Sequence, residues 1–214
     1  MYDFHCHTTM SDGELIPTEL IRRMAVAGYT EMAIADHADF SNVELLIQSQ
    51  EKVKRSAALY GVRLFTGVEI THVPPAEIAD LAKYARSLGA EVVIVHGETI
   101  TEPVAPGTNL AAVTCPDVDI LAHPGMISEE EALLAAKNGV FLEITSRNGH
   151  NKANGHVLAS ARRAGAGVVV QSDIHGPDDI INEKMRGLVA RGAGMSEDEA
   201  EMVLSLTSAE ILSL

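Results

Sequence analysis

Histidines and carboxylates close the short hydrophobic runs of this 214-residue sequence. The run DFHCH ends at His5 and His7, and VVVQSDIH ends at Asp173 and His175. The runs between these two end at His37, Glu69, His96 and His123, and Arg147 follows the run FLEITS. Imidazole nitrogens and carboxylate oxygens are the donors that zinc, manganese and iron take in proteins. The sequence therefore predicts a metal site built from these residues.

The spacing of these residues predicts that they meet in space. Successive run ends lie 24 to 32 residues apart from His5 to Asp173, a step close to the roughly 30 residues of one strand–helix unit. A parallel barrel places the carboxyl ends of all its strands on one face. Residues two apart in a strand point the same way, so His5 and His7 can reach into the mouth together. The same holds for Asp173 and His175.

The number of candidate ligands exceeds what one tetrahedral site can use. A lone histidine at a strand end is more often an ordinary hydrogen-bonding residue than a ligand. Six of the nine histidines stand at strand ends in one register, which chance explains poorly. We therefore infer two or three metal ions that share a bridging carboxylate. Glu69 is the expected bridge, because it is the only carboxylate that ends a central strand.

Four further residues keep two interpretations each. Asp12, in TTMSDGE, is either a ligand or part of an Asx turn before the first helix. Arg147 either grips a phosphate through its fork of N–H groups or lies in solvent. His150, in RNGHNKANGH, belongs equally well to the site or to the surface. Glu143 either orients a ligand or packs at the edge of the core.

Other candidates are predicted to lie outside the ligand set. Asp36 precedes His37 and should point to the opposite side, in a supporting or structural role. Cys6 should face the core, so we do not expect it to act as a nucleophile. His72 fits a surface loop as well as the mouth, and His156 is expected in solvent.

Alternating strand and helix patterns must position these residues. The strands are expected at residues 2–6, 31–36, 62–70, 91–96, 118–122, 140–145 and 167–172. The helices are expected at 17–27, 43–60, 76–88, 128–138, 152–164 and 178–191, with one short helix in the loop 97–117 and one or two more after Ser196. Strict alternation predicts a parallel sheet, open or closed into a barrel. We expect a single domain over residues 1–214.

Composition excludes several classes of protein. Apolar residues make up 46% and charged residues 21% of the chain, which is typical of a globular protein. The net charge of −14 and the 4% of aromatic residues make nucleic acid a poor partner. Two cysteines and no long apolar run predict a cytoplasmic protein without a disulfide scaffold or a membrane span. The dinucleotide-binding, P-loop and serine-hydrolase motifs are missing from the sequence.

The complete series of motifs resembles a known family. In order across residues 3–177, the sequence contains DFHCHTTMSDG, IADHAD, GVEIT, IVHGE, LAHPG and QSDIHGP. This series resembles the PHP (polymerase and histidinol phosphatase) family. The resemblance implies a distorted (β/α)7 TIM-like barrel and a trinuclear metal centre. The residues themselves predict a C-terminal helical tail and two or three divalent zinc, manganese or iron ions. The resemblance also implies that His5, His7, Glu69 and Asp173 hold one ion, that Glu69, His96 and His123 hold a second, and that Asp12, His37 and His175 hold a third.

Such a centre is suited to the hydrolysis of phosphate esters. Three divalent ions bring six positive charges against the three negative charges of Asp12, Glu69 and Asp173, so the mouth favours a phosphate dianion. We expect a small phosphorylated metabolite as substrate, attacked by a metal-bridging hydroxide as in a histidinol-phosphate phosphatase. Glu69 would be the catalytic bridge and Arg147 would grip the phosphate. His37 or a metal-bound water would protonate the leaving group.

Three alternatives remain at this stage. A PHP-type phosphodiesterase or exonuclease would share the metals, although the acidic charge disfavours it. An amidohydrolase-type barrel also begins with H-x-H, but it usually needs a longer chain. A non-enzymatic, metal-binding regulatory module would lack catalysis, yet no motif residue is missing here. We expect neither nucleic acid nor membrane as a partner, and the sequence is compatible with a homo-oligomer.

Overall fold

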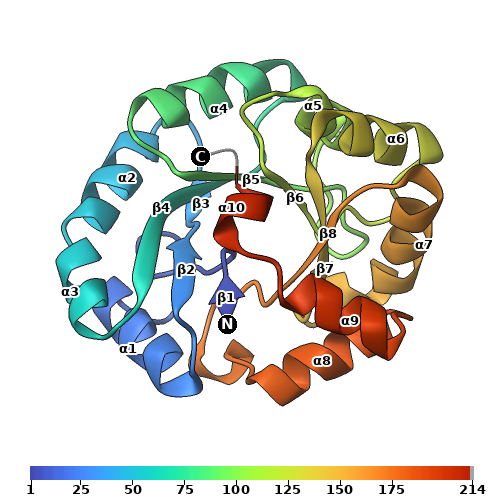
Figure 1. Cartoon of the computed structure of the whole chain (residues 1–214). Helices are drawn as coiled ribbons and strands as arrows, with labels where there is room; N and C mark the ends of the chain where they lie inside the picture. The colour runs from blue at the N-terminus through green and yellow to red at the C-terminus, as the bar shows by residue number, and fades with distance from the viewer. Residues whose placement is uncertain (213–214) are drawn as a thin grey trace.

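Parallel strands form a nearly closed barrel in the computed structural model, which describes residues 1–212 (Figure 1). The strands are β1 (Tyr2–Asp3), β2 (Glu31–Ile34), β3 (His37–Ala38), β4 (Arg63–Ile70), β5 (Val92–His96), β6 (Ile120–Ala122), β7 (Phe141–Thr145) and β8 (Val168–Gln171). Each main strand pairs in parallel with the next along the chain, while β2 and β3 pair with successive parts of β4 as one interrupted strand. The predicted seven-stranded barrel is confirmed.

The barrel closes between the segments that follow β1 and β8. Cys6 forms a parallel bridge with Ile174. The backbone N–H of His7 donates to the carbonyl of Ile174 at 2.7 Å, and the N–H of Ile174 donates to the carbonyl of His5 at 3.2 Å. We call this contact the seam. It holds the H-x-H and D-x-H motifs side by side.

Helices surround the strands, as the alternating pattern predicts (Figure 1). They are α1 (Pro17–Ala27), α2 (Val43–Glu51), α3 (Lys54–Leu59), α4 (Ile78–Ser87), α5 (Thr108–Thr114), α6 (Glu129–Asn138), α7 (Asn154–Ala164), α8 (Glu183–Gly192), α9 (Glu197–Leu204) and α10 (Ser208–Ile211). Single 3-10 turns precede α4, α7 and α8, at Pro75–Glu77, His150–Ala153 and Pro177–Asp179. Among the described residues, no helix is long and apolar enough to cross a membrane.

Local signals set several helix ends. Ser128 caps α6 by accepting from the N–H of Glu131, and α1 ends at Gly28 with φ +94°. Two expectations were wrong. The helix expected at 178–191 begins only at Glu183, after the 3-10 turn Pro177–Asp179, and residues 43–60 form two helices instead of one. The chain turns after Glu51, and Lys54 at the start of α3 then pairs with Glu91 at 2.7 Å, so a tertiary contact overrides the local helical pattern.

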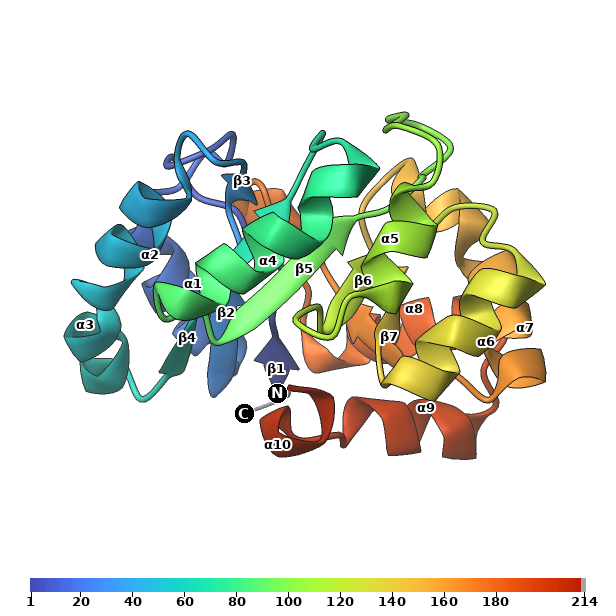
Figure 2. The same cartoon turned by 90° about the horizontal axis from the view of Figure 1, so that it is seen from above.

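Apolar side chains fill the barrel interior at the end opposite the carboxyl ends of the strands. Phe4, Phe65 and Ile94 pack there with Ile211 and Leu212 from the end of the described chain. Figure 2 shows α9 and α10 lying across this end, away from the loops that follow the strands. The histidine and carboxylate cluster therefore rests on a packed apolar base and opens only toward the carboxyl ends of the strands.

Candidate metal centre

All nine predicted ligands gather at the carboxyl ends of the strands. Their donor atoms form four overlapping groups in which the atoms lie within 4.8 Å of one another. These groups are His7–Asp12–His37–His175, His5–His123–Asp173, His5–His7–Glu69 and Glu69–His96–His123. The groups overlap, so neighbouring groups share a residue.

Glu69 occupies the middle of the cluster. Its Oε1 lies 3.3 Å from Nε2 of His5 and 3.6 Å from Nε2 of His123. Its Oε2 lies 3.5 Å from Nε2 of His7 and 2.8 Å from Nδ1 of His37. The two oxygens of one carboxylate thus face different sets of histidines, which is the geometry that a bridging role requires.

The buried donor atoms fit divalent cations. Nε2 of His5, Nε2 of His7 and Oε1 of Glu69 are shielded from solvent and have no hydrogen-bond partner among the described residues. A buried polar atom without a partner costs about 1–3 kcal/mol. Several such atoms converge here, and all of them are chemically suited to zinc, manganese or iron. A bound cation would satisfy them together.

Glu143 orients the ring of His5 and holds the backbone of His123. Its Oε1 lies 2.7 Å from Nδ1 of His5, and its Oε2 accepts from the backbone N–H of His123 at 2.8 Å. This contact turns Nε2 of His5 toward Glu69. His96 is oriented in a similar way, because its Nδ1 lies 3.1 Å from the carbonyl of Gly97. Of the two interpretations of Glu143, the geometry supports the orienting role.

A buried carboxylate supports the loop that carries Asp12. Asp36 accepts from the N–H and the hydroxyl of Thr8 at 2.7 and 2.8 Å, and from the hydroxyl of Ser11 at 2.7 Å. Asp12 then lies 3.3 Å from Nε2 of His175 and 3.5 Å from Nε2 of His37. Asp36 therefore has the expected supporting role, and Asp12 faces the cluster.

Backbone strain is concentrated at the same mouth. Among the described residues, three that are not glycine have positive φ: His72 at +57°, His123 at +25° and Asp173 at +52°. Such conformations cost about 1–3 kcal/mol each and persist where surrounding contacts impose them. Two of the three are predicted ligands, and the third lies at the rim beside them.

The carboxylates of the cluster raise the pKa values of two neighbouring histidines. Burial lowers the pKa of His37, but Glu69 and Asp12 outweigh burial and raise this pKa to about 10. Burial also opposes the charged form of His175, yet Asp12 and Asp173 raise its pKa to about 9. Protons on these two histidines compete with metal ions for the same nitrogens, so metal binding releases them.

Arg147 and His150 both line the small cavity at the centre of the cluster. Nη1 of Arg147 lies 2.8 Å from Oδ2 of Asp179. His150 is buried, with its Nδ1 2.9 Å from the hydroxyl of Thr99 and its ring centroid 4.3 Å from that of His123. The structure thus places both residues at the mouth.

The sequence analysis missed Glu102. This residue stands on the loop between β5 and α5, and its carboxylate lies 3.5 Å from Nε2 of His72, 3.8 Å from Nε2 of His96 and 3.9 Å from Nε2 of His150. The sequence of this loop has no hydrophobic periodicity from which the position of Glu102 could be predicted. The one available signal was that its loop follows a strand that ends in a predicted ligand.

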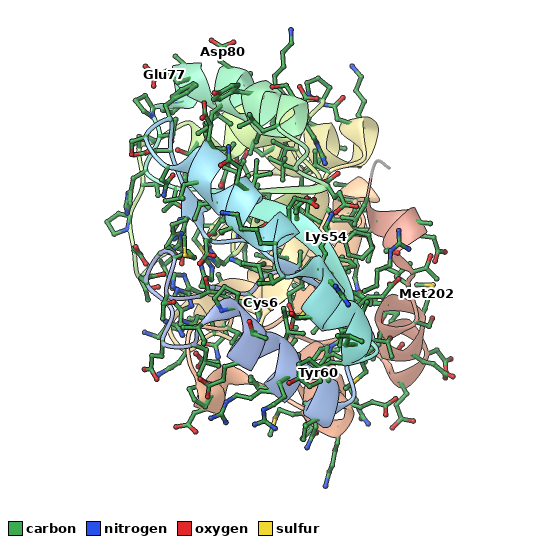
Figure 3. The ribbon with its side chains drawn as sticks, turned by 90° about the vertical axis from the view of Figure 1, so that its left-hand side faces the viewer. Cys6, Lys54, Tyr60, Glu77, Asp80 and Met202 are labelled. Carbon is green, nitrogen blue, oxygen red and sulfur yellow. The ribbon has the colours of Figure 1, made fainter. Side chains whose placement is uncertain are left out.

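Two residues lie away from the cluster. Cys6 is fully buried against the inner face of α1, and burial raises the pKa of its thiol well above the usual value, as expected for a core residue (Figure 3). The prediction for His156 was wrong. Its Nε2 lies 2.8 Å from the carbonyl of Ile127, and the side chain is partly buried. This contact ties α7 to the loop before α6.

A barrel with this donor cluster at the carboxyl ends of its strands defines a metal-dependent hydrolase. The chain belongs to the PHP domain family, whose model matches residues 3–140, and it is a metal-dependent phosphoesterase of that family. The expected family is thereby confirmed.

Known relatives and solved structures agree with this family. The chain is 46% identical over 213 residues to an uncharacterized protein of Methanocaldococcus jannaschii, covering 99% of this chain and 98% of the relative. It is 28% identical to a probable phosphatase of Thermoanaerobacter sp., covering 92% and 87%. A Listeria monocytogenes structure provisionally named the histidinol phosphatase hisK has the same fold, with a TM-score of 0.64 at 13% identity, covering 86% of this chain and 99% of that one.

Proposed function

We propose that the protein hydrolyses small phosphomonoesters. The observation that carries the proposal is the position of Arg147, which lines the same cavity as Asp12, His37, His96, His123, Asp173 and His175. A guanidinium presents a fork of N–H groups that matches two phosphate oxygens. A cavity with metal-binding residues on one side and an arginine on another is suited to a terminal phosphate group.

The residues that would hold the metal ions are the nine of the cluster, with Glu69 shared between ions. Divalent ions bound there would lower the pKa of a coordinated water and neutralise charge on the phosphoryl oxygens. Glu143 keeps His5 oriented for this purpose. Asp36 keeps the loop of Asp12 in place.

Arg147 would bind and orient the phosphate. Asp179 holds one of its terminal nitrogens, and the same carboxylate oxygen accepts from the backbone N–H groups of His175 and Gly176 at 2.9 Å. The guanidinium is therefore anchored to the segment that carries a predicted ligand, while its other N–H groups remain for the substrate.

A metal-coordinated water, or His37 where it holds no ion, would deliver the proton that the leaving alkoxide requires. The side chain of His37 is 23% exposed, against 14% or less for the other five predicted histidine ligands. It therefore stands nearest to the open side of the cluster, where the alcohol departs. A general acid has to lie within hydrogen-bond reach of the leaving oxygen.

Nuclease activity is the second candidate, because some relatives carry nuclease names. A 5'-3' exoribonuclease of Haemophilus influenzae is 39% identical over 70 residues, which is 33% of this chain and 23% of that protein. The charge of −14 disfavours a long polyanion at the surface. A small monoester fits inside the mouth, where screening over about 8 Å at physiological salt leaves the field of the centre intact.

A comparison of two chromogenic esters tests the proposal. With manganese or zinc, p-nitrophenyl phosphate should show kcat/KM at least about tenfold above bis-p-nitrophenyl phosphate after correction for intrinsic reactivity, a barrier difference of about 1.4 kcal/mol. A Glu69→Gln variant controls for contaminating phosphatase. Preference for the diester would favour nuclease activity over phosphomonoesterase activity. Full metal binding without turnover of either ester would favour a regulatory module.

A further inference from the structure

The barrel wall has an opening between β1 and β8, on the amino-terminal side of the seam. β1 pairs with β2 and β8 pairs with β7, but no ladder joins β1 to β8 among residues 1–212. A parallel ladder continued from the seam would direct the N–H of His5 at the backbone that follows β8. This N–H donates instead to Oδ1 of Asp3 at 3.1 Å. The two motifs that meet at the seam therefore stand beside a part of the wall that the sheet itself does not close.

One arginine side chain fills this opening. Arg186 belongs to α8, which lies between α1 and α9 in the ring of helices (Figure 1), and the residue is 2% exposed. Its Nη2 donates to the carbonyl of Val170 in β8 at 3.0 Å. Its guanidinium carbon lies 4.8 Å from the ring centroid of Tyr2 in β1, and the face of an aromatic ring attracts a cation at this distance. A single guanidinium thus contacts both edges of the opening.

The charge of Arg186 also reaches Asp3. Burial raises the pKa of the Asp3 carboxyl, and the nearby guanidinium of Arg186 opposes that rise. Asp3 in turn accepts from the N–H of His5, the first histidine of H-x-H. On the other edge, Val170 stands three residues before Asp173, which begins D-x-H. Arg186 is therefore linked to both motifs through residues that are not themselves predicted ligands.

Stability alone explains this arrangement poorly. Nε of Arg186, Oδ2 of Asp3 and Oγ of Ser172 are shielded from solvent and have no hydrogen-bond partner among the described residues. Buried charges with unpaired polar atoms oppose folding, and apolar residues of similar volume often replace them without loss of stability. In some proteins such groups instead fix one arrangement of the chain. The arrangement fixed here is the one that brings the two motifs together.

The distances that depend on this arrangement lie across the seam. Oδ1 of Asp173 is 3.6 Å from Nε2 of His5 and 3.3 Å from Nε2 of His7. The backbone of Asp173 has φ +52°, a conformation that surrounding contacts must impose. A shift of either edge of the opening would change these distances, because both motifs follow directly from its edges in the chain.

We propose that Arg186 is a positioning residue of the metal centre. It holds β1 and β8 at the separation at which the histidines of H-x-H and the carboxylate of Asp173 can share one cation. It does so from α8, outside the ligand set. The inference concerns the assembly of the centre, so it goes beyond the proposed function and holds whichever ester is hydrolysed.

Cobalt(II) tests the inference without turnover, because its visible absorption reports the ligand geometry of the site that binds it. Arg186→Met keeps a long side chain and removes its charge and hydrogen bonds. We expect this variant to raise the cobalt dissociation constant about tenfold, the lower end of the range for groups that support metal ligands, and to change the spectrum. Arg186→Lys should give intermediate values, because lysine keeps the charge but has no planar group to contact both edges. Chelator competition gives the constants, and denaturant unfolding of the metal-free proteins gives their stability.

Arg86→Met is the matched control. Arg86 is also a partly buried arginine on a helix, α4, and its Nη2 lies 2.6 Å from Oδ2 of Asp119, which precedes β6 at the amino end of the strands. This variant should lose stability and keep the wild-type cobalt affinity and spectrum. Wild-type affinity and spectrum in folded Arg186→Met would overturn the inference, and so would an equal loss of affinity in both methionine variants. Should Arg186→Met fail to fold, wild-type values in Arg186→Lys would overturn it, and weaker binding with an altered spectrum would support it.

Discussion

Replacing Glu143 by glutamine should weaken metal binding although this residue is not itself a predicted ligand. Both of its oxygens are buried and face hydrogen-bond donors, Nδ1 of His5 at 2.7 Å and the N–H of His123 at 2.8 Å. The amide of glutamine would direct its own N–H groups at one of these donors. At least one hydrogen bond of a charged group, about 1.5–3 kcal/mol, is then lost.

That loss corresponds to a measurable change in affinity. Outer partners of metal-binding histidines typically contribute about 10–100-fold to metal affinity, and this range equals about 1.4–2.7 kcal/mol. We therefore expect the manganese dissociation constant of Glu143→Gln to rise by about one to two orders of magnitude. Competition with a chromogenic chelator measures it directly, and circular dichroism confirms that the variant is folded.

Glu91→Gln is the matched control. Glu91 also accepts from a backbone N–H, that of Thr66 at 2.9 Å, but it precedes β5 at the amino end of the strands. This variant should lose some stability and keep the wild-type affinity for manganese. Wild-type affinity in a folded Glu143→Gln protein would refute the orienting role and return Glu143 to simple core packing.

The remaining predictions concern the bridge, the phosphate clamp and acid stability. Glu69→Gln should weaken more than one metal site and lower turnover by roughly 10³-fold or more, about 4 kcal/mol in barrier; full metal content with near-normal turnover would contradict this. Arg147→Ala should impair hydrolysis of every phosphorylated substrate at unchanged metal content. Arg147→Lys should recover only part of the activity, because lysine cannot form two parallel hydrogen bonds to a phosphate. Unchanged kinetics in the alanine variant would mean that Arg147 does not bind the phosphate. Burial raises the pKa of Glu91, but Lys54 and Thr66 outweigh burial and lower this pKa in the folded protein. The ionised Glu91 therefore stabilises the fold at pH values above its unfolded pKa of about 4.3. This stabilisation is lost as the pH falls through the lower folded pKa. Denaturant unfolding of wild type and Glu91→Gln should therefore differ at pH 7 and converge in strong acid; a constant difference would argue against the ion pair.

The barrel could be predicted because its signals are local. Each strand is a short hydrophobic run closed by a polar residue, and glycines such as Gly28 end the helices between them. Parallel topology then fixes which ends meet, so the gathering of His5, Glu69 and His123 required no knowledge of side-chain contacts. The break between α2 and α3 had no comparable signal, because Lys54 is drawn to Glu91 by tertiary structure.

The rim of the site could not be predicted, because its residues stand on loops whose conformation depends on tertiary contacts. Glu98 accepts from the N–H groups of Gly107 and Asn109 at 2.9 and 3.0 Å, and this contact ties the base of the loop that carries Glu102. Nothing in the spacing of those residues indicates it. The roles of Glu143 and His150 stayed open for the same reason, since each depends on a partner far away in sequence, His5 and Thr99 respectively.

The seam has a consequence for the order of events during biosynthesis. It joins Cys6, which precedes α1, to Ile174, which is made after every helix up to α7. Pairing between such distant segments is slow. Until they pair, strand edges and apolar surfaces stay exposed on the nascent chain. The H-x-H and D-x-H motifs cannot meet before the last strand is complete. A shared metal ion can therefore be captured only late, so the supply of metal and the exposure of the unfinished barrel are linked in time.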